Sequence, residues 1–177
     1  MSNPESILQK YWGHTSFRNS QQKVIAEALM GNDVLALLPT GAGKSICFQI
    51  PALSKEGTCI VISPLIALMN DQVSSLKNKG IKAEFISGEM SPKQMDYTLD
   101  NCIYGETKFL YLSPERLNSI FVRERLKRMK INFIAVDEAH CISQWGHDFR
   151  PAYRNIKDIR LILENVPVIA LTATATD

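Results

Sequence analysis

The chain has 177 residues, of which 45% are hydrophobic and 21% charged, and its formal net charge is +2. This length and composition predict a single globular domain covering residues 1–177. A charge so close to neutral excludes a strongly basic nucleic-acid-binding chain, so any basic surface has to be local.

Six short runs rich in apolar residues predict strands, at 33–38, 58–63, 83–87, 108–112, 132–137 and 166–172. Most are continuously apolar, which is typical of strands buried on both faces of a parallel sheet. Helical patterns lie between them at 44–53, 64–80 and 113–130. Alternating strands and helices predict an α/β fold, a parallel sheet with helices on both faces.

The pattern over 113–130 includes the basic run "VRERLKRMK". Its apolar residues are spaced as one buried helix face, and we expect that face to comprise Leu117, Ile120, Phe121, Leu126 and Met129. The arginines and lysines then lie on the solvated face, and contact with nucleic acid is the lesser alternative.

The four cysteines and the N-terminus indicate the cellular setting. Cys47, Cys59, Cys102 and Cys141 are far apart without a Cys-x-x-Cys pair, so we expect buried thiols and no zinc site. No apolar signal region opens the chain, and no apolar run approaches the ~18 residues of a membrane-spanning helix. We therefore expect a cytoplasmic protein without membrane contact.

The segment "PTGAGKS" follows the first predicted strand and precedes a helix, where backbone N–H groups can bind an anion. Gly41 and Gly43 allow positive φ, Lys44 can reach the β- and γ-phosphates, and the Ser45 hydroxyl can hold Mg²⁺. A full phosphate-binding loop would start with glycine where this chain has Leu38. A simple connecting loop is the alternative. The candidate nucleotide-binding residues here are Thr40, Gly41, Ala42, Gly43, Lys44 and Ser45.

The segment "FIAVDEAH" places two acids at the carboxyl end of a predicted strand, where ligands bind in open parallel sheets. Asp137 can hold Mg²⁺ through water, and Glu138 can orient and deprotonate an attacking water. Two acids at a helix N-terminus would be the structural alternative. With the glycine-rich loop ~94 residues upstream, the pair predicts a Mg²⁺-dependent nucleotide hydrolase.

The motifs "DEAH" and "PTGAGKS" resemble those of superfamily 2 helicases, in which the phosphate loop commonly lacks the first glycine. Five further segments, in family order, resemble the RecQ DNA helicases: "WGHTSFRNSQQ", "VISPLIALMNDQV", "YLSPERL", "CISQWGHDFRPAY" and "ALTATAT". The resemblance implies a RecA-like P-loop NTPase lobe that uses ATP and Mg²⁺.

The resemblance also implies residue roles. Gln21 would read the adenine edge with Arg18 and His14 nearby, although His14 replaces the aromatic residue usual there. Trp145, Phe149 and Arg150 would lie along single-stranded DNA, whereas His147 would face the nucleotide. Ser63, Ser113, Thr172 and Thr174 would contact DNA or couple it to hydrolysis.

The residues alone leave some of these roles open. Trp145 and Phe149 could be core packing residues, although aromatics interleaved with polar residues suit base stacking. Ser63 and Ser113 read first as helix caps, and a cap can coincide with a DNA-backbone contact. Thr172 and Thr174 could simply end a strand.

The resemblance covers only the first motor lobe of such an enzyme. We expect a second lobe elsewhere in the full-length chain, single-stranded and partly duplex DNA as partners, 3′-to-5′ translocation, and work in DNA repair or recombination. A bacterial protein would be nucleoid-associated. The isolated lobe should bind ATP weakly and unwind nothing. An RNA-remodelling ATPase of superfamily 2 and a nucleotide-gated binding module without hydrolysis are the alternatives.

Overall fold

The computed structural model describes residues 3–142 and 150–173. Its centre is one six-stranded sheet in the order β1-β6-β5-β2-β4-β3, and every neighbouring pair is parallel. Each strand lies within a predicted run or within one residue of it. The strands are β1 Val34–Leu37, β2 Thr58–Ile62, β3 Ala83–Ile86, β4 Phe109–Leu112, β5 Ile131–Val136 and β6 Val168–Thr172.

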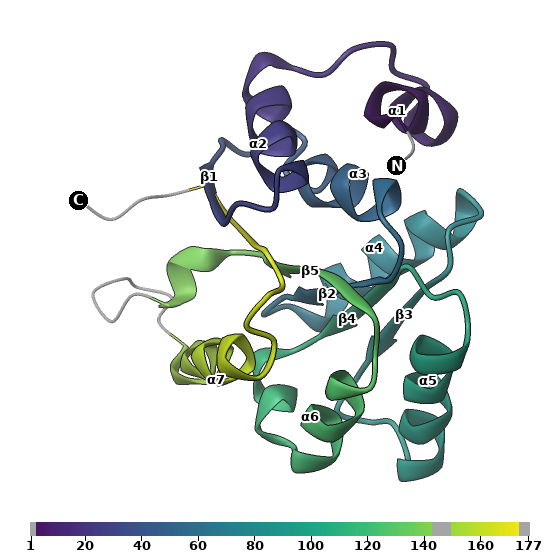
Figure 1. The fold of residues 1–177 in the computed structure, drawn as a ribbon. Coiled ribbons are helices and arrows are strands. Elements are labelled where there is room, and N and C mark those ends of the chain that lie inside the picture. Colours follow the sequence, from purple (N-terminus) through teal and green to yellow (C-terminus); the bar gives the residue numbers. More distant parts are fainter. Residues whose placement is uncertain (1–2, 143–149, 174–177) are drawn as a thin grey trace.

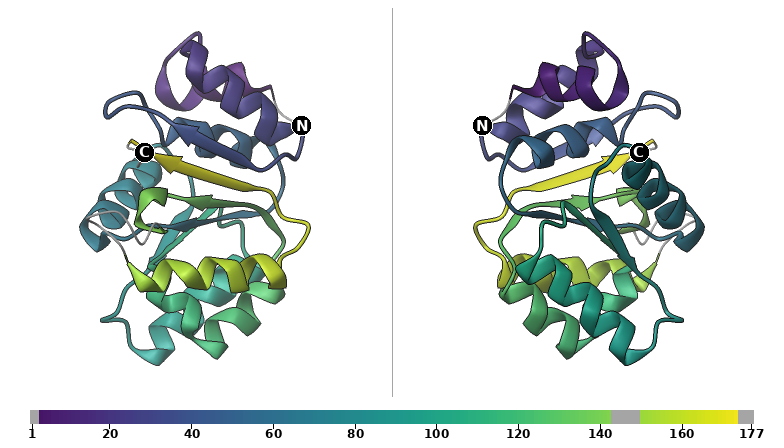
Figure 2. Two further views of the ribbon diagram at one scale, coloured as in Figure 1. Left: turned by 90° about the vertical axis from the view of Figure 1, so that its left-hand side faces the viewer. Right: turned by 90° about the vertical axis from the view of Figure 1, so that its right-hand side faces the viewer.

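Helices cover both faces of this sheet, as Figures 1 and 2 show. The α-helices are α1 Pro4–Trp12, α2 Asn19–Leu29, α3 Ile46–Ser54, α4 Ile66–Asn78, α5 Pro92–Tyr104, α6 Ile120–Lys127 and α7 Asn155–Ile162. Three short 3₁₀ helices are η1 Pro114–Asn118, η2 Ala139–Ile142 and η3 Pro151–Arg154. Helices α2, α3 and α4 pack on one face, and α5, α6 and α7 on the other. The predicted α/β class is confirmed.

Strand β2 explains why the core has two halves. Its successive side chains point to opposite faces, so Cys59 and Val61 join one hydrophobic cluster while Ile60 and Ile62 join the other. All five residues of the strand are buried. Helix α1 lies outside this arrangement and packs through Ile7 and Leu8 onto α2 and α3.

Strand β1 departs from the expectation of burial on both faces. Leu35 is 74% exposed and Leu37 55% exposed, whereas Ala36, on the other face, belongs to the core. The reason is position, because β1 lies at the edge of the sheet and pairs only with β6 in the described part of the chain.

The single helix predicted over 113–130 is wrong. The structure contains η1 and then α6, with a break at Ser119, whose hydroxyl accepts a hydrogen bond from the Val122 N–H at 3.4 Å. The break changes the helical phase, so Val122 is buried while Ile120 is 78% and Phe121 43% exposed. The rest of the expected apolar face is buried: Leu117, Leu126 and Met129.

All four cysteines are buried and free, as predicted. Burial raises the pKa of Cys47 and of Cys102 to about 12, so these thiols are protonated and weakly nucleophilic at neutral pH. None of the described helices is both long and apolar enough to cross a membrane.

Candidate nucleotide-hydrolysis site

Three neighbouring strands bring the predicted site residues to one edge of the sheet. Because β1, β6 and β5 are adjacent and parallel, their carboxyl ends meet at that edge. The glycine-rich loop at 39–45 follows β1, the acids follow β5, and Thr172 ends β6. The loop and the acids, ~94 residues apart in sequence, are thereby placed together.

Leu38 shows why this loop has no glycine at its first position. Its N–H donates to the Thr172 carbonyl at 2.9 Å, which continues the β1–β6 pairing by one residue. Its side chain is 4% exposed and lies in the core. The chain turns later, at Gly41 and Gly43, whose φ values of 79° and 73° favour glycine. Leu38 therefore packs and pairs, and does not shape the phosphate loop.

Two residues near the start of α2 hold the loop in place. The Gln21 side-chain amide donates to the Ala42 carbonyl at 2.9 Å and to the Gly43 carbonyl at 3.3 Å. The Arg18 guanidinium donates to the Gly41 carbonyl at 2.8 Å. A Cβ on Gly43 would lie only 2.6 Å from the Gln21 Nε2, so a larger residue there would displace the Gln21 amide from the loop.

A cavity of about 460 Å³ adjoins this contact and is lined in part by His14, Arg18, Gln21 and Gly43. The volume falls within the range of small-ligand pockets. Three residues that the resemblance associates with adenine thus line one cavity beside the loop. Both N–H groups of the Gln21 amide are used in this structure, and its oxygen accepts the Arg18 backbone N–H at 3.0 Å.

The acidic pair faces the loop lysine. The Lys44 Nζ lies 3.7 Å from the Glu138 Oε1, and the two side chains are 15% and 26% exposed. Asp137 is 9% exposed. Burial raises the pKa of Asp137, the neighbouring Glu138 charge raises it further, and Lys44 and a hydrogen bond from Gln72 oppose both effects. This edge therefore contains an acidic pair that is only partly neutralised.

Glu138 has a strained backbone. Its φ of 49° is the only positive value at a non-glycine residue in the described ranges. Such a conformation costs on the order of 1–3 kcal/mol and persists where neighbouring contacts enforce it, often at functional sites. The Glu138 N–H donates to the Asp137 Oδ1 at 3.0 Å, so the aspartate side chain helps to hold this turn.

His140 connects this acid to the end of β6. Its Nδ1 lies 3.4 Å from the Glu138 Oε2 and 3.0 Å from the Thr172 Oγ1. A coupling role was predicted for Thr172 but none for His140, although His140 is the last residue of "DEAH". Thr172 is buried at the site rather than at the surface.

Two buried tyrosines support the acids, and the sequence analysis did not identify either of them. The Tyr111 hydroxyl donates to the Gln72 Oε1 at 2.9 Å, and the Gln72 side chain in turn bonds to Asp137. The Tyr153 hydroxyl donates to the Asp137 backbone carbonyl at 2.9 Å. A buried tyrosine in a strand or after a loop carries no sequence signal that separates this role from ordinary packing.

Comparison with known proteins was consistent with this geometry. The sequence pattern of DEAD/DEAH box helicases matches residues 18–177. The chain belongs to the DEAD/DEAH box helicase family. The acidic pair and the glycine-rich loop of this helicase domain are the segments that face each other in the structure.

Within that family, the chain is similar to RecQ helicases. It is 47% identical to the ATP-dependent DNA helicase RecQ of Haemophilus influenzae, over 96% of this chain and 28% of that protein. It is 49% identical to the Bacillus subtilis protein of the same name, over 97% of this chain and 29% of that protein. The chain therefore spans less than a third of the length of these two relatives.

Solved structures of other helicases share the fold. The helicase MrfA bound to DNA and AMPPNP superposes with a TM-score of 0.81 at 18% identity, over all of this chain and 27% of that one. Mycobacterium smegmatis Lhr bound to ssDNA and AMP-PNP gives a TM-score of 0.70 at 20% identity, over 98% of this chain and 26% of that one. These likenesses establish a helicase lobe architecture.

Several residues expected to meet DNA have a different local setting from the one predicted. Ser63 is 1% exposed and its hydroxyl has no hydrogen-bond partner among the described residues, whereas Ser113 is half-buried. Neither caps a helix through its side chain, because α4 starts later, after Leu65, and η1 has no side-chain cap. The capping prediction is therefore wrong for Ser63, whereas Ser113 stands at the N-cap position of η1 without a side-chain hydrogen bond to it. The DNA contacts of both serines stay predictions.

Of the residues in the aromatic-rich segment that are predicted to contact DNA, only Arg150 lies in the part of the chain that the structure describes. Its guanidinium donates to the Pro64 carbonyl at 3.0 Å, and its backbone N–H donates to the Cys141 carbonyl at 3.0 Å. Arg150 thus joins the region after "DEAH" to the segment before α4. Four further residues with predicted roles lie outside the described residues: Trp145, His147, Phe149 and Thr174.

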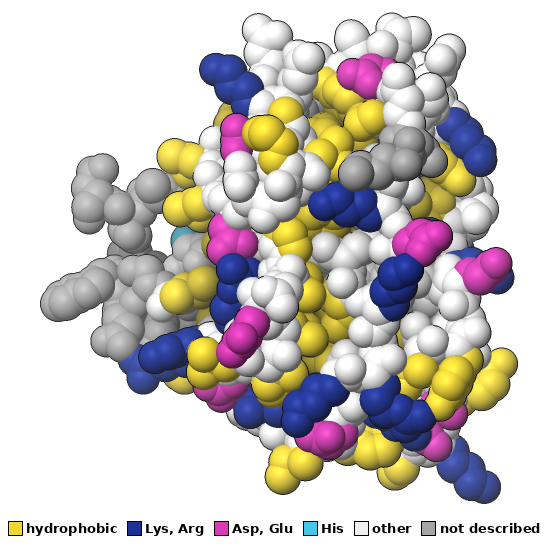
Figure 3. Space-filling view, viewed as in Figure 1, with side chains coloured by type: hydrophobic (Ala, Val, Ile, Leu, Met, Phe, Trp, Pro, Cys, Tyr) yellow, Lys and Arg dark blue, Asp and Glu magenta, His cyan; other side chains and the backbone are white. Residues whose placement is uncertain are grey.

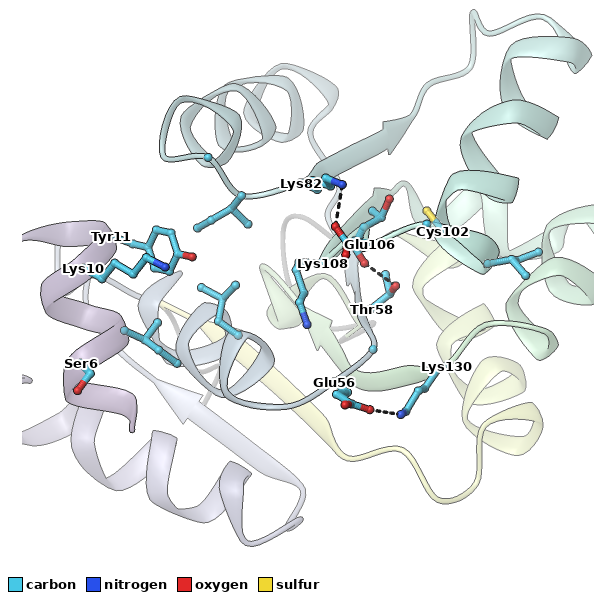
Figure 4. A pocket seen from close by; sticks show the side chains of 18 residues that line it. Ser6, Lys10, Tyr11, Glu56, Thr58, Lys82, Cys102, Glu106, Lys108 and Lys130 are labelled. Carbon is cyan, nitrogen blue, oxygen red and sulfur yellow. Dashed lines mark hydrogen bonds and ion pairs between the residues drawn. The ribbon is translucent and has the colours of Figure 1, made fainter. Parts of the chain in front are cut away.

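A larger cavity, of about 870 Å³, lies at the opposite edge of the sheet, where α3, α4 and α5 end (Figure 4). Lys82 pairs with Glu106 at 2.9 Å, and Lys130 pairs with Glu56. Lys108 donates to the carbonyl of Lys55, the C-cap residue of α3, at 3.3 Å.

Helix C-termini carry partial negative charge, so cations are favourable beside them. Three lysines around this cavity, Lys82, Lys108 and Lys130, are accounted for by the end of α3 and by the two glutamates. On the face shown in Figure 3, positive and negative side chains are interspersed rather than separated by sign. The carboxyl edge therefore stays the predicted nucleotide site, despite the smaller cavity there.

Proposed function

We propose that this chain is the ATP-binding and ATP-hydrolysing lobe of a RecQ-type DNA helicase. The observation that carries the proposal is the 3.7 Å approach of Lys44 to Glu138, which joins the glycine-rich loop to the acidic pair. A phosphate held by Lys44 would lie beside the group expected to activate water. Similarity to RecQ proteins along nearly the whole chain supports the choice of DNA as substrate.

The residues at the carboxyl edge fit a magnesium–nucleotide complex. Gly41 and Gly43 give the loop its open backbone, and α3 begins directly after it, at Ile46. Ser45 and the buried Asp137 would hold Mg²⁺, which would neutralise phosphate charge. Asp137, whose pKa is raised by burial, gains from a nearby cation, because a positive charge favours its ionised form.

Within this proposal, each remaining site residue has one task. Lys44 binds the β- and γ-phosphates, and Glu138 orients the attacking water and accepts its proton. His140 contacts both Glu138 and Thr172, so it links the base to the end of β6. Ala42 and Thr40 complete the phosphate loop.

The cavity beside α2 is proposed to take the adenine. His14, Arg18 and Gln21 would contact the base, with His147 on the nucleotide side. To donate a hydrogen bond to adenine, Gln21 would exchange one of its bonds to the loop carbonyls, because both N–H groups of its amide are used here. Base binding would thereby be coupled to the position of the phosphate loop.

DNA contact and unwinding belong to the full-length protein. We propose that Trp145, Phe149 and Arg150 contact single-stranded DNA and that Ser63 and Ser113 lie near its backbone. Thr172 and Thr174 would couple this contact to hydrolysis. A second lobe would add a transition-state arginine, worth about 10³–10⁵ in rate, so the 177-residue chain alone should hydrolyse ATP poorly and unwind nothing. Translocation would run 3′ to 5′, in DNA repair or recombination, and a bacterial protein would be nucleoid-associated.

The test is the nucleic-acid dependence of ATP hydrolysis in the full-length protein. We expect single-stranded DNA to stimulate hydrolysis strongly and RNA of the same sequence to do so weakly. Stronger stimulation by RNA would instead support an RNA-remodelling ATPase. Tight ATP binding without hydrolysis under either condition would support a nucleotide-gated binding module.

A further inference from the structure

The peptide bond between Asp137 and Glu138 is fixed at both of its polar groups. Its N–H donates to the Asp137 Oδ1 at 3.0 Å, and its carbonyl accepts a hydrogen bond from the Tyr153 hydroxyl at 2.9 Å. The next residue, Glu138, has the positive φ of 49°. The strained turn that presents the glutamate is therefore held from one side by its own aspartate and from the other by Tyr153.

Tyr153 is suited to a fixed donor role. Its side chain is 1% exposed and belongs to the core cluster that contains Val136, the residue before Asp137. Burial, followed by the nearby acidic groups, raises the pKa of the phenol, so the hydroxyl keeps its proton. With no rotation into solvent and no loss of the proton, the phenol supplies a constant hydrogen bond.

Backbone hydrogen bonds connect Tyr153 to the same turn by a second route. The Cys141 N–H donates to the Glu138 carbonyl at 2.9 Å, and the Arg150 N–H donates to the Cys141 carbonyl at 3.0 Å. The Tyr153 N–H then donates to the Arg150 carbonyl at 3.0 Å. These backbone hydrogen bonds therefore position Tyr153 relative to the acids, and its hydroxyl bonds to the Asp137 carbonyl.

We propose that Tyr153 is a positioning residue for Glu138: its hydroxyl locks the Asp137–Glu138 peptide so that the carboxylate of Glu138 faces Lys44. The inference rests on the proposed role of Glu138 as the base. Without the hydroxyl, the peptide can rotate and relieve the positive φ of Glu138, which turns the carboxylate away from Lys44. Hydrolysis would then slow while the phosphate loop, which Tyr153 does not touch, still binds ATP.

The test uses Tyr153→Phe in the full-length helicase, because phenylalanine keeps the packed ring and removes only the hydroxyl. The matched control is Thr58→Val. Thr58 is 3% exposed, and its hydroxyl also donates to a backbone carbonyl, that of Thr107 at 2.7 Å, but at the opposite edge of the sheet. Both variants therefore lose one buried hydroxyl bond to the backbone.

We expect Tyr153→Phe to lower kcat of the DNA-stimulated ATPase about tenfold, equivalent to ~1.4 kcal/mol in the barrier, with KM for ATP changed less than about twofold. Thr58→Val should leave both constants within about twofold of the unsubstituted enzyme. An unchanged kcat for Tyr153→Phe, or an equal fall for Thr58→Val, would overturn the proposal.

Hydrogen exchange of the nucleotide-free full-length protein gives a second readout. Amides in a peptide covering 131–142 should exchange faster in Tyr153→Phe than in Thr58→Val, and equal exchange in the two variants would also contradict the proposal. The underlying role of Glu138 is tested separately by Glu138→Gln. If that variant loses activity while Tyr153→Phe does not, the positioning role fails and the proposed function stands.

Discussion

The two edges of the same parallel sheet hold their charged side chains in different ways. At the amino edge, Lys82 and Lys130 pair with glutamates, and Lys108 bonds to the carbonyl that ends α3. At the carboxyl edge, two adjacent acids share one lysine, burial raises the pKa of Asp137, and Glu138 has a strained backbone.

The difference separates charges that stabilise the fold from charges that are available for chemistry. The amino edge has the larger cavity, yet its lysines already complement glutamates and helix ends. The carboxyl edge has one buried and one half-buried acid whose negative charges are only partly compensated. A ligand that brings a cation can complete this compensation. Incomplete charge compensation is therefore a better indicator of the site than the volume of the cavity.

Replacing one lysine at each edge tests this comparison with the largest expected effect. In the full-length protein, Lys44→Ala should lower kcat for ATP by about 10²–10³, because phosphate charge loses its compensation in the site. Lys108→Ala should leave the ATPase rate within about twofold and cost less than ~1 kcal/mol of stability, the usual worth of a cation at a helix end. Steady-state ATPase and thermal denaturation measure both. Equal loss of activity in the two variants would remove the distinction between the edges.

Removing the predicted DNA-stacking aromatics tests whether the carboxyl edge senses DNA. Trp145→Ala or Phe149→Ala should reduce stimulation by single-stranded DNA about tenfold, since stacking is worth ~1–3 kcal/mol per base. The basal rate without DNA should change little. Phe121→Ala is the control, because Phe121 is an aromatic residue 43% exposed on α6.

ATPase rates with and without DNA, together with melting temperatures, decide between the two roles considered for these aromatics. If the basal rate and the melting temperature fall together, Trp145 and Phe149 are packing residues, and DNA coupling has to be sought elsewhere.

Asp137→Asn should have a smaller effect than the preceding substitutions, and it should stabilise the fold rather than impair a function. Burial raises the pKa of Asp137 in the folded chain above its ordinary value of ~3.9, which applies to the unfolded chain. At a pH between the unfolded-state pKa and the folded-state pKa, the folded chain keeps a proton that the unfolded chain has released. Stability therefore falls as pH rises through that window, and the ionised acid destabilises the fold at neutral pH. Without nucleotide and Mg²⁺, the variant of the 177-residue chain should melt about 2–4 °C higher at pH 7, the shift of ~1 kcal/mol in a domain this size.

The stability gain of Asp137→Asn should shrink as the pH is lowered, because the aspartic acid then becomes neutral as well. A series of melting curves from pH 7 downward measures this trend. A variant that melts lower than the unsubstituted chain at pH 7 would show that the acid is already compensated.

The sequence predicted the sheet well because buried parallel strands leave a strong apolar signal. The prediction of one helix over 113–130 failed because the Ser119 hydroxyl caps the start of a new helix, α6. The apolar spacing alone does not show this break. The expected burial of β1 on both faces was also wrong, because β1 lies at the edge of the sheet. Which strand lies at the edge depends on pairing between distant segments of the chain.

At the site, the sequence predicted the groups that carry charge but not those that hold them. Lys44, Asp137 and Glu138 belong to motifs whose chemistry requires them. Tyr111 and Tyr153 act through single hydrogen bonds across 39 and 16 residues of chain, and nothing local distinguishes them from packing residues. The positive φ of Glu138 was equally invisible, because glutamate has no preference for it.

The central claim is that Glu138 accepts the proton of the water that attacks ATP, and Glu138→Gln in the full-length protein tests it most directly. The amide fits the same space but cannot take a proton, so single-turnover hydrolysis with saturating DNA should fall about 10²–10⁴-fold. ATP affinity, measured by equilibrium binding, should stay within about threefold, because Lys44 and the phosphate loop are unchanged. Hydrolysis at the unsubstituted rate would show that Glu138 is not the base and would contradict the account.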